Sequence, residues 1–239
     1  MPTAPLSDLS RYYETVAPFY GAEMAVRTDL ALWRDVVART GARSVIDLGC
    51  GDGRVARAIA GQADVVGIDL LTSLLPADPS ERGFEYVQTD MRELPFGDGR
   101  FDLAIAANDP FAHLLEDADR TRAIDEALRV AGRLVIDGLS LTAADDARAR
   151  AAGCVRECVL PDKTVRHETW HSIGGHRYRT TYRYLRGDTV LAEASTDVRA
   201  WTPDEPALQG RAVRIFGGLD GRAHDLEERG FVIGIGGPL

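Results

Sequence analysis

The stretch VIDLGCGDGR, residues 45–54, decides how this sequence is interpreted. An apolar run rich in branched side chains ends at Asp47-Leu48, and glycines follow at positions 49, 51 and 53. The next residues, 54–61, have the pattern of a helix that ends at a glycine. Glycines let the backbone turn sharply and let a ligand approach without a clash against a Cβ atom. The stretch is therefore either a ligand-free corner between a strand and a helix or the floor of a binding site.

The composition limits the classes of protein that remain. The chain has 239 residues, 45% of them hydrophobic and 27% charged, which is typical of one soluble domain with a small appendage. Its net charge of -9 argues against a surface that binds nucleic acid. No apolar run approaches the ~20 residues of a membrane span, and no secretory signal is visible at the N-terminus. The cysteines lack the spacing of a metal site, so we expect no metal and a reduced, cytoplasmic protein.

Strand-like and helix-like segments alternate between residues 44 and 139, which predicts an α/β fold with a doubly wound, mostly parallel sheet. Extended segments between 160 and 201, separated by Gly174-Gly175 and Gly187-Asp188, predict an antiparallel β flap inserted after the fifth strand. We expect an N-terminal helical lid over 1–40, an α/β core over 41–153, the flap over 154–202, and a return to the core over 203–239 with a helix at 219–230 and a last strand.

Polar residues follow three further strands of the predicted sheet. Asp69 ends the second strand, eighteen residues after Gly51, where a carboxylate can accept hydrogen bonds from both hydroxyls of a ribose. Asp90-Met91 follows the third strand and offers an acceptor for an exocyclic amine beside an apolar side chain for a purine face. AANDPF, residues 106–111, ends the fourth. Because ligands bind at the carboxyl ends of such strands, we expect these groups to converge on one nucleoside-sized crevice.

These motifs resemble those of the class I S-adenosylmethionine-dependent methyltransferases. VIDLGCGDGR is similar to their first motif, VVGIDL (65–70) to the second, TDMRELPF (89–96) to the adenine-binding turn and FDLAIAANDPFAHL (101–114) to the fourth. The resemblance covers roughly residues 43–139 and implies a Rossmann-like methyltransferase fold with S-adenosylmethionine as cofactor and S-adenosylhomocysteine as product. Asp52, inside the turn, disfavours the pyrophosphate of a dinucleotide, whereas an acidic crevice favours a sulfonium cation.

The resemblance assigns roles to individual residues of the cofactor site. It implies contacts from Asp47, Gly49, Cys50, Gly51, Asp69, Leu70, Asp90, Met91, Ala107 and Asn108. The lead-in RYYETVAPFYG (11–21) is similar to an aromatic lid in which Tyr13 and Tyr20 close on the cofactor, and Arg27 is placed to pair with the methionine carboxylate. Ordinary surface or core packing is the alternative for these last three residues.

The layout after Leu139 resembles that of sugar N,N-dimethyltransferases, in which an antiparallel sheet helps to cover the substrate. We therefore expect methyl transfer to nitrogen or oxygen of a small molecule, with His113 as the candidate base and Asp109 as a second candidate for orienting an amine. The alternative for His113 is a histidine on a helix surface. Trp170 and the histidines at 167, 171 and 176 suggest a wall facing substrate or a partner subunit, or else a solvated face. The arginines at 177, 179, 183 and 186 indicate a solvated face, with contact to an anionic substrate as the less favoured alternative.

Two other functions stay open, and the C-terminus departs from the family pattern. The chain could bind S-adenosylmethionine without catalysis, or be a nicotinamide-dependent oxidoreductase, although its glycine spacing disfavours the second. A homodimer through the flap is compatible with the sequence, although no motif marks one. Pro76 and Pro79 predict a short or broken helix after the second strand. Only FVIGIGGPL (231–239) follows the last predicted helix, so we expect the family's final antiparallel strand to be absent or to lie beyond residue 239.

Overall fold

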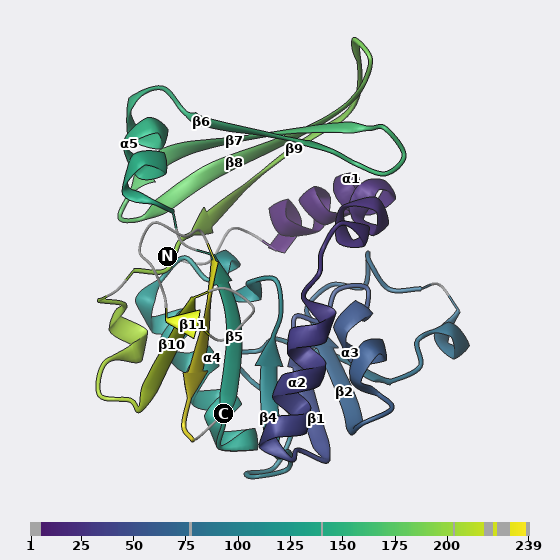
Figure 1. Cartoon of the computed structure of the whole chain (residues 1–239), viewed down its shortest axis with the longest axis vertical. Coiled ribbons are helices and arrows are strands. Elements are labelled where there is room, and N and C mark those ends of the chain that lie inside the picture. Colours follow the sequence, from purple (N-terminus) through teal and green to yellow (C-terminus); the bar gives the residue numbers. More distant parts are fainter. Residues whose placement is uncertain are drawn as a thin grey trace.

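The computed structural model describes residues 6–76, 78–139, 141–202, 204–217, 222–223 and 230–237. Within these residues the strands form two sheets, one of eight strands in the order β11-β10-β12-β5-β4-β1-β2-β3 and one of four strands in the order β6-β7-β8-β9. Figure 1 shows the smaller sheet as a layer of its own, with helix α1 (Leu6–Ala25) between it and the larger sheet. None of the helices in the described part of the chain is long and apolar enough to cross a membrane.

The larger sheet has a parallel centre, as the alternating pattern predicts. Its parallel strands are β1 (Ser44–Leu48), β2 (Asp64–Asp69), β3 (Glu85–Gln88), β4 (Leu103–Ala106) and β5 (Leu134–Leu139). β1 is flanked by β2 and β4, so the chain reverses its direction of winding beside the glycine turn. In sheets of this kind the reversal creates a crevice at the carboxyl ends of the strands, which is where ligands bind.

Helices cover both faces of this sheet because each central strand is apolar on both faces. Val45 of β1 packs in one core with Trp33 of α2 (Leu30–Thr40) and Val55 of α3 (Arg54–Ile59). Ile46 packs in the other core with Ile124 of α4 (Asp117–Ala131). Residues 30–40 were predicted to belong to the N-terminal helical lid. In the structure they form α2, whose buried side chains pack against the core.

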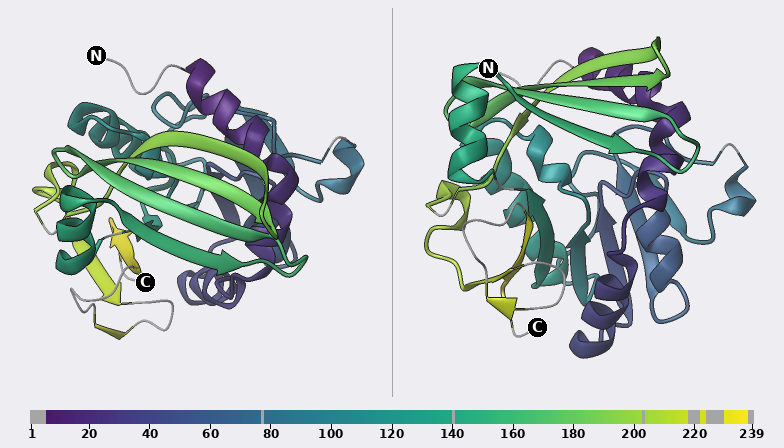
Figure 2. Two further views of the ribbon diagram at one scale, coloured as in Figure 1. Left: turned by 90° about the horizontal axis from the view of Figure 1, so that it is seen from above. Right: turned by 45° about the horizontal axis from the view of Figure 1, so that its top comes forward.

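The antiparallel flap follows β5 and a short helix, α5 (Ala143–Ala151). Its strands are β6 (Cys154–Val159), β7 (Val165–Gly174), β8 (Arg177–Arg186) and β9 (Thr189–Arg199), each paired with its neighbour in sequence. The two predicted glycine turns thus connect hairpins. The inner face of the flap packs on α1, where the rings of Phe19 and Tyr184 stack with centroids 4.1 Å apart. The two views in Figure 2 show the flap lying across the molecule with α1 along its underside.

The C-terminal part of the sheet corrects the expectation of a missing strand. β12 (Gly230–Ile235) is itself the antiparallel strand, and it lies between β5 and β10 (Val213–Gly217), which the sequence pattern did not predict. Most of the helix predicted at 219–230 falls on 219–221 and 224–229, which lie outside the described residues. At 222–223 the prediction is wrong, because these residues form strand β11 (Arg222–Ala223). In the described residues of the segment after β2 the one helical element is the short 3₁₀ helix η1 (Pro79–Glu81), as its prolines predict.

A buried arginine ties the flap to the parallel half of the molecule. Arg120 of α4 is fully buried and donates to the carbonyl oxygen of Leu114, which follows the 3₁₀ helix η2 (Pro110–His113). Its Nη1 atom lies 3.1 Å from a carboxylate oxygen of Glu205, beside a third 3₁₀ helix, η3 (Pro206–Leu208). The guanidinium stacks over the ring of Trp201, which follows β9. This one side chain therefore fixes the end of the flap relative to the turn after β4.

Candidate active site

The glycine turn after β1 has a backbone that only glycine adopts without strain. Gly49 and Gly51 have φ angles of 67° and 55°, in the left-handed region. A Cβ atom on Gly49 would lie 2.4 Å from Cβ of Pro110, and one on Gly51 would lie 3.2 Å from the hydroxyl of Tyr20. The backbone of the turn therefore forms the floor of the space above it, and a side chain at either position would protrude into that space.

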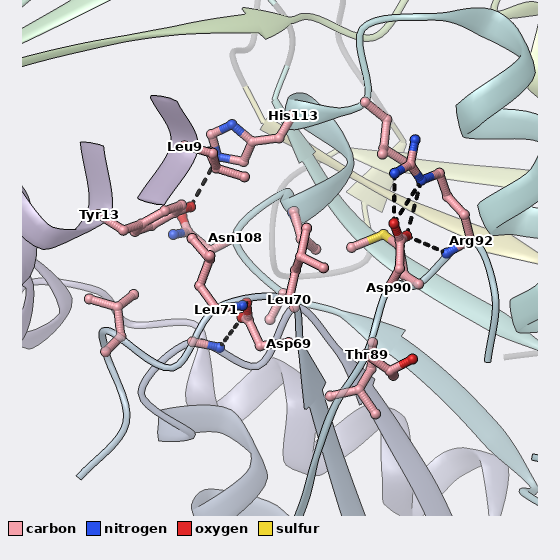
Figure 3. A pocket seen from close by; sticks show the side chains of 18 of the residues that line it. Leu9, Tyr13, Asp69, Leu70, Leu71, Thr89, Asp90, Arg92, Asn108 and His113 are labelled. Carbon is pink, nitrogen blue, oxygen red and sulfur yellow. Dashed lines mark hydrogen bonds and ion pairs between the residues drawn. The ribbon is translucent and has the colours of Figure 1, made fainter. Parts of the chain in front are cut away.

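A cavity of about 220 Å³ lies above this turn, at the carboxyl ends of β1, β2, β3 and β4. It brings together most of the residues predicted to bind the cofactor: Tyr13, Tyr20, Gly49, Gly51, Asp69, Leu70, Asp90, Met91, Ala107 and Asn108, with His113 at its edge. Figure 3 shows Asp69 and Asp90 on neighbouring strand ends and Tyr13 and His113 above them. Thr89, the first residue of TDMRELPF, also lines it, as do Leu9, Leu71 and Leu74, which belong to none of the quoted motifs.

Asp69 is held at the cavity wall by two backbone donors. The N–H of Gly51 donates to Oδ2 over 2.9 Å and the N–H of Leu71 donates to Oδ1 over 3.0 Å. Burial raises the pKa of this carboxyl, and the backbone hydrogen bonds oppose that rise. The bonds also fix the orientation of both oxygens before any ligand arrives. The geometry suits the acceptance of two hydroxyl hydrogen bonds from one ligand.

Asp90 is bound by an arginine that the sequence motifs did not single out. Arg92 donates from Nη2 to Oδ2 of Asp90 over 2.6 Å and from Nη1 to Asp119 over 2.9 Å. Burial alone would raise the pKa of Asp90, but the hydrogen bonds and charge of Arg92 outweigh it and lower the pKa. Asp90 is therefore ionised at neutral pH, as an acceptor for an exocyclic amine must be. Arg92 lies two residues after Asp90, so its place in the same turn was the available signal.

Two predicted cofactor residues lie behind the cavity rather than in its wall. Asp47 is buried, and the pKa of its carboxyl is raised to about 8 by burial and by the nearby charge of Asp69. The thiol of Cys50 is buried against Gly67, and its backbone N–H donates to the carbonyl of Ile68 over 2.9 Å. Both residues shape the turn from behind.

Arg27 also lies away from this first cavity. Its guanidinium donates to Oδ1 of Asn108 and to Oδ2 of Asp137, each over 2.6 Å, and to Asp29 over 3.2 Å. Asp29 in turn accepts two hydrogen bonds from Arg54, which together with Arg27 lower its pKa to about 2 although burial opposes this. In this arrangement Arg27 orients Asn108, whereas its predicted contact with a methionine carboxylate stays a prediction.

Tyr13 and His113 form a pair between the first cavity and a second one. The hydroxyl of Tyr13 lies 3.0 Å from Nε2 of His113, and both side chains line both cavities. Burial lowers the pKa of His113 to about 4, so its imidazole is neutral at pH 7. Burial also raises the pKa of Tyr13, which keeps its proton. Among the described residues, Tyr20 and Asn108 also line both cavities.

The second cavity, of about 550 Å³, lies between α1, the inner face of the flap and the ends of β4 and β5. Aromatic and charged side chains line it, among them Tyr12, Glu23, Asp109, Asp137, Arg156, Arg166, Glu168, Trp170 and Tyr182. Asp109 accepts a hydrogen bond from Nε1 of Trp201 over 3.0 Å. This cavity is the one of the two that the flap encloses, and it is large enough for a small molecule.

The flap places the predicted tryptophan and histidines on different faces. Trp170 is buried on the inner face and lines the second cavity. His167 lies on the outer face and pairs with Glu157 over 2.9 Å, while His171 and His176 are exposed. The histidines therefore do not form a wall facing the cavity. The four arginines of the predicted stripe each pair with a carboxylate: Arg177 with Glu116, Arg179 with Asp197, Arg183 with Glu193 and Arg186 with Asp162.

Comparison with known proteins agrees with this fold. Residues 45–132 match the family described as methyltransferase domain. A malonyl-acyl-carrier-protein O-methyltransferase of Legionella pneumophila is 35% identical over 71 residues, a match that spans 27% of this chain and 25% of that relative. The methyltransferase CcbJ from Streptomyces caelestis superimposes with a TM-score of 0.73 and 21% identity, over 95% of this chain and 98% of its own. CalS10 of Micromonospora echinaspora is an amino pentose methyltransferase solved with S-adenosylmethionine. It superimposes with a TM-score of 0.71 and 20% identity, over 92% of this chain and 95% of its own.

Over residues 45–132 the chain matches the methyltransferase domain family, and the fold and the site of the described residues agree with a class I S-adenosylmethionine-dependent methyltransferase. Residues 45–132 form the methyltransferase domain itself, whose cofactor is S-adenosylmethionine.

Proposed function

We propose that this protein transfers a methyl group from S-adenosylmethionine to a nitrogen or oxygen atom of a small molecule, in the biosynthesis of a natural product. The observation that carries the proposal is the Tyr13–His113 pair, which separates the cofactor cavity from a second cavity under the flap. A transferase needs two sites that meet at the reacting atoms, because catalysis of a displacement depends on alignment.

The first cavity fits the proposed cofactor. The glycine turn leaves its floor free of side chains, Asp69 has both oxygens oriented for hydroxyls, and Asp90 is ionised beside Met91. When bound there, S-adenosylmethionine supplies an electrophilic methyl group on a sulfonium cation. The carboxylates of this crevice favour a positive charge.

The chain's own contribution to the transfer is to hold the acceptor and its proton. If Nε2–H of His113 donates to Tyr13, then Nδ1, which is buried and has no partner among the described residues, keeps a lone pair for an N–H or O–H of the acceptor. With a pKa of about 4, this imidazole accepts a hydrogen bond but is a weak base. An amine in its neutral form requires no strong base, so this environment favours nitrogen over oxygen.

The solved relatives support a small acceptor. CalS10 is an amino pentose methyltransferase, and KedS8 from Streptoalloteichus, which gives a TM-score of 0.66 at 22% identity, is a sugar N-methyltransferase. Both superimpose over most of this chain, covering 92% and 87% of it. At these identities the likeness extends to the fold, and the choice of acceptor rests on the second cavity.

Titration calorimetry with S-adenosylhomocysteine tests the cofactor site. We expect wild-type protein to bind it and Asp69→Ala to bind at least about tenfold more weakly, because two charge-assisted hydrogen bonds are lost. Asp64→Ala is the matched control, since Asp64 begins the same strand and is exposed. Methyl transfer is then measured on a panel of amines and alcohols. Binding without any transfer would favour a non-catalytic protein, and equal affinities for the two variants would contradict the assignment of the site.

A further inference from the structure

The second cavity has a wall of charged side chains at the end away from His113. On the inner face of the flap, Arg156 of β6 lies opposite Glu168 of β7, which lies opposite Tyr182 of β8. The ring of Tyr12 bridges from Tyr182, at a centroid distance of 5.7 Å, to His113, at 6.4 Å. Two aromatic rings therefore separate the imidazole from the charged wall.

Arg166, one of the arginines in this wall, holds two close carboxylates, although its Nε atom is buried without a hydrogen-bond partner among the described residues. Its nitrogens lie 3.2 Å from Glu23 of α1 and 3.1 Å from Glu168, and its guanidinium stacks over Tyr182. Glu23 also accepts the hydroxyl hydrogen bond of Tyr184 over 2.7 Å. Arg166 thus connects α1 to the flap through two close ion pairs.

Arg156 lies farther from its carboxylate neighbours than Arg166 does. Its Nε and Nη2 atoms are buried and make no hydrogen bond to any residue in the described ranges. The nearest carboxylate oxygens are 3.5 Å away, on Asp145, and 4.0 Å away, on Glu168. The ring of Trp170 supports the guanidinium at 5.3 Å, and the side chain is 20% exposed. A guanidinium that has two long ion pairs but leaves two buried nitrogens without hydrogen bonds is costly to the free protein, and a ligand that supplies acceptor oxygens reduces that cost.

We propose that the methyl acceptor carries an acidic oxygen group, a carboxylate or a phosphate, that binds to Arg156. This inference rests on the proposed function, and it adds the chemistry of the part of the substrate that lies away from His113. The planar guanidinium matches two oxygens of one acidic group, whereas a single hydroxyl satisfies only one donor. The acceptor is then bifunctional, with a nucleophile beside His113 and an acidic group at the charged wall.

The test uses protein saturated with S-adenosylhomocysteine, so that the cofactor cavity is closed to the probes. Benzoate, phenyl phosphate and the neutral isostere benzamide are titrated by calorimetry into wild-type protein, Arg156→Gln, Arg156→Lys and Arg179→Gln. Arg179 is the matched control, because it lies on the outer face of the same sheet and pairs with Asp197. We expect one of the two acids to bind wild-type protein at least about tenfold more tightly than benzamide does. Arg156→Gln should abolish that preference, Arg156→Lys should keep part of it, and Arg179→Gln should leave it unchanged.

Two results would overturn the inference: equal binding of acids and benzamide to wild-type protein, or the same preference in Arg156→Gln as in Arg179→Gln. The first comparison uses no variant, so it holds even if a substitution disturbs folding. Binding of S-adenosylhomocysteine and methyl transfer to amines are measured on the same samples. If both persist while the acids show no preference, the substrate inference is wrong and the proposed function stands. If neither occurs, the proposed function itself fails.

Discussion

Replacing Gly49 by alanine is expected to destabilise the protein and to weaken cofactor binding together. Two effects add at this position. An L-residue in the left-handed region costs about 1–2 kcal/mol, and Gly49 has a φ of 67°. The new Cβ would also lie 2.4 Å from Cβ of Pro110, which belongs to a rigid ring, and such overpacking costs about 1–3 kcal/mol. We therefore expect a loss of about 2–5 kcal/mol and a decrease in Tm of roughly 10 °C.

Two other glycines separate the two effects. Gly41 has a φ of 62°, and a Cβ atom added there would meet nothing within 4 Å, so Gly41→Ala should cost only the backbone strain. Gly61 has neither a positive φ nor a close neighbour, so Gly61→Ala should be nearly neutral or stabilising. Thermal unfolding measures the three stabilities and titration with S-adenosylhomocysteine measures the site. The reasoning is refuted if Gly49→Ala unfolds at the same temperature as Gly41→Ala and binds the cofactor product normally.

Three further predictions concern His113, Tyr13 and Arg120. The pKa of His113 is about 4 in the folded protein against an ordinary 6.5, so the unfolded chain binds the proton at a higher pH than the folded protein does. The free energy of unfolding should therefore fall as the pH drops from 6.5 to 4. Denaturant titrations at several pH values should show a smaller fall for His113→Gln. Tyr13→Phe should lower kcat roughly fivefold, because it removes one hydrogen bond that contributes about 1 kcal/mol. Tyr12→Phe should change kcat little. Equal kcat values for the two variants in steady-state kinetics would contradict this prediction. Arg120→Met should cost about 3–5 kcal/mol in denaturant unfolding, because buried Glu205 keeps only Arg199 as a partner and the carbonyl oxygens of Leu114 and Arg199 lose their donor. Arg122→Met, at an exposed pair, should cost less than about 0.5 kcal/mol.

The parts of the fold that the sequence predicts are those encoded by local patterns. Five apolar runs alternating with helical segments predict the parallel strands and, through them, the convergence of Asp69, Asp90 and Asn108 at one edge. β10 was not predicted, because VRIFG contains no long apolar run. In the sheet it pairs with β11 and β12, and no local sequence pattern indicates either pairing.

The parts that escape prediction are long-range polar pairings. No local sequence pattern indicates that Arg27 binds Asp137, 110 residues later, or that Arg120 binds Glu205, which follows the flap in the sequence. The faces of β7 could have been assigned, because successive side chains of a strand alternate. Trp170 and His171 are adjacent, so they lie on opposite faces, and an apolar Trp170 on the inner face leaves His171 outside.

The position of β12 has a consequence for how the protein is made. β5 ends at Leu139, but the strand that covers its free edge begins only at Gly230, after the whole flap has been synthesised. During translation the backbone N–H and C=O groups along one edge of β5 are therefore unpaired until β12 is made. Such an open edge is a template for intermolecular strand pairing. Chaperone dependence and aggregation of nascent chains should accordingly decline only once residues 230–235 have left the ribosome.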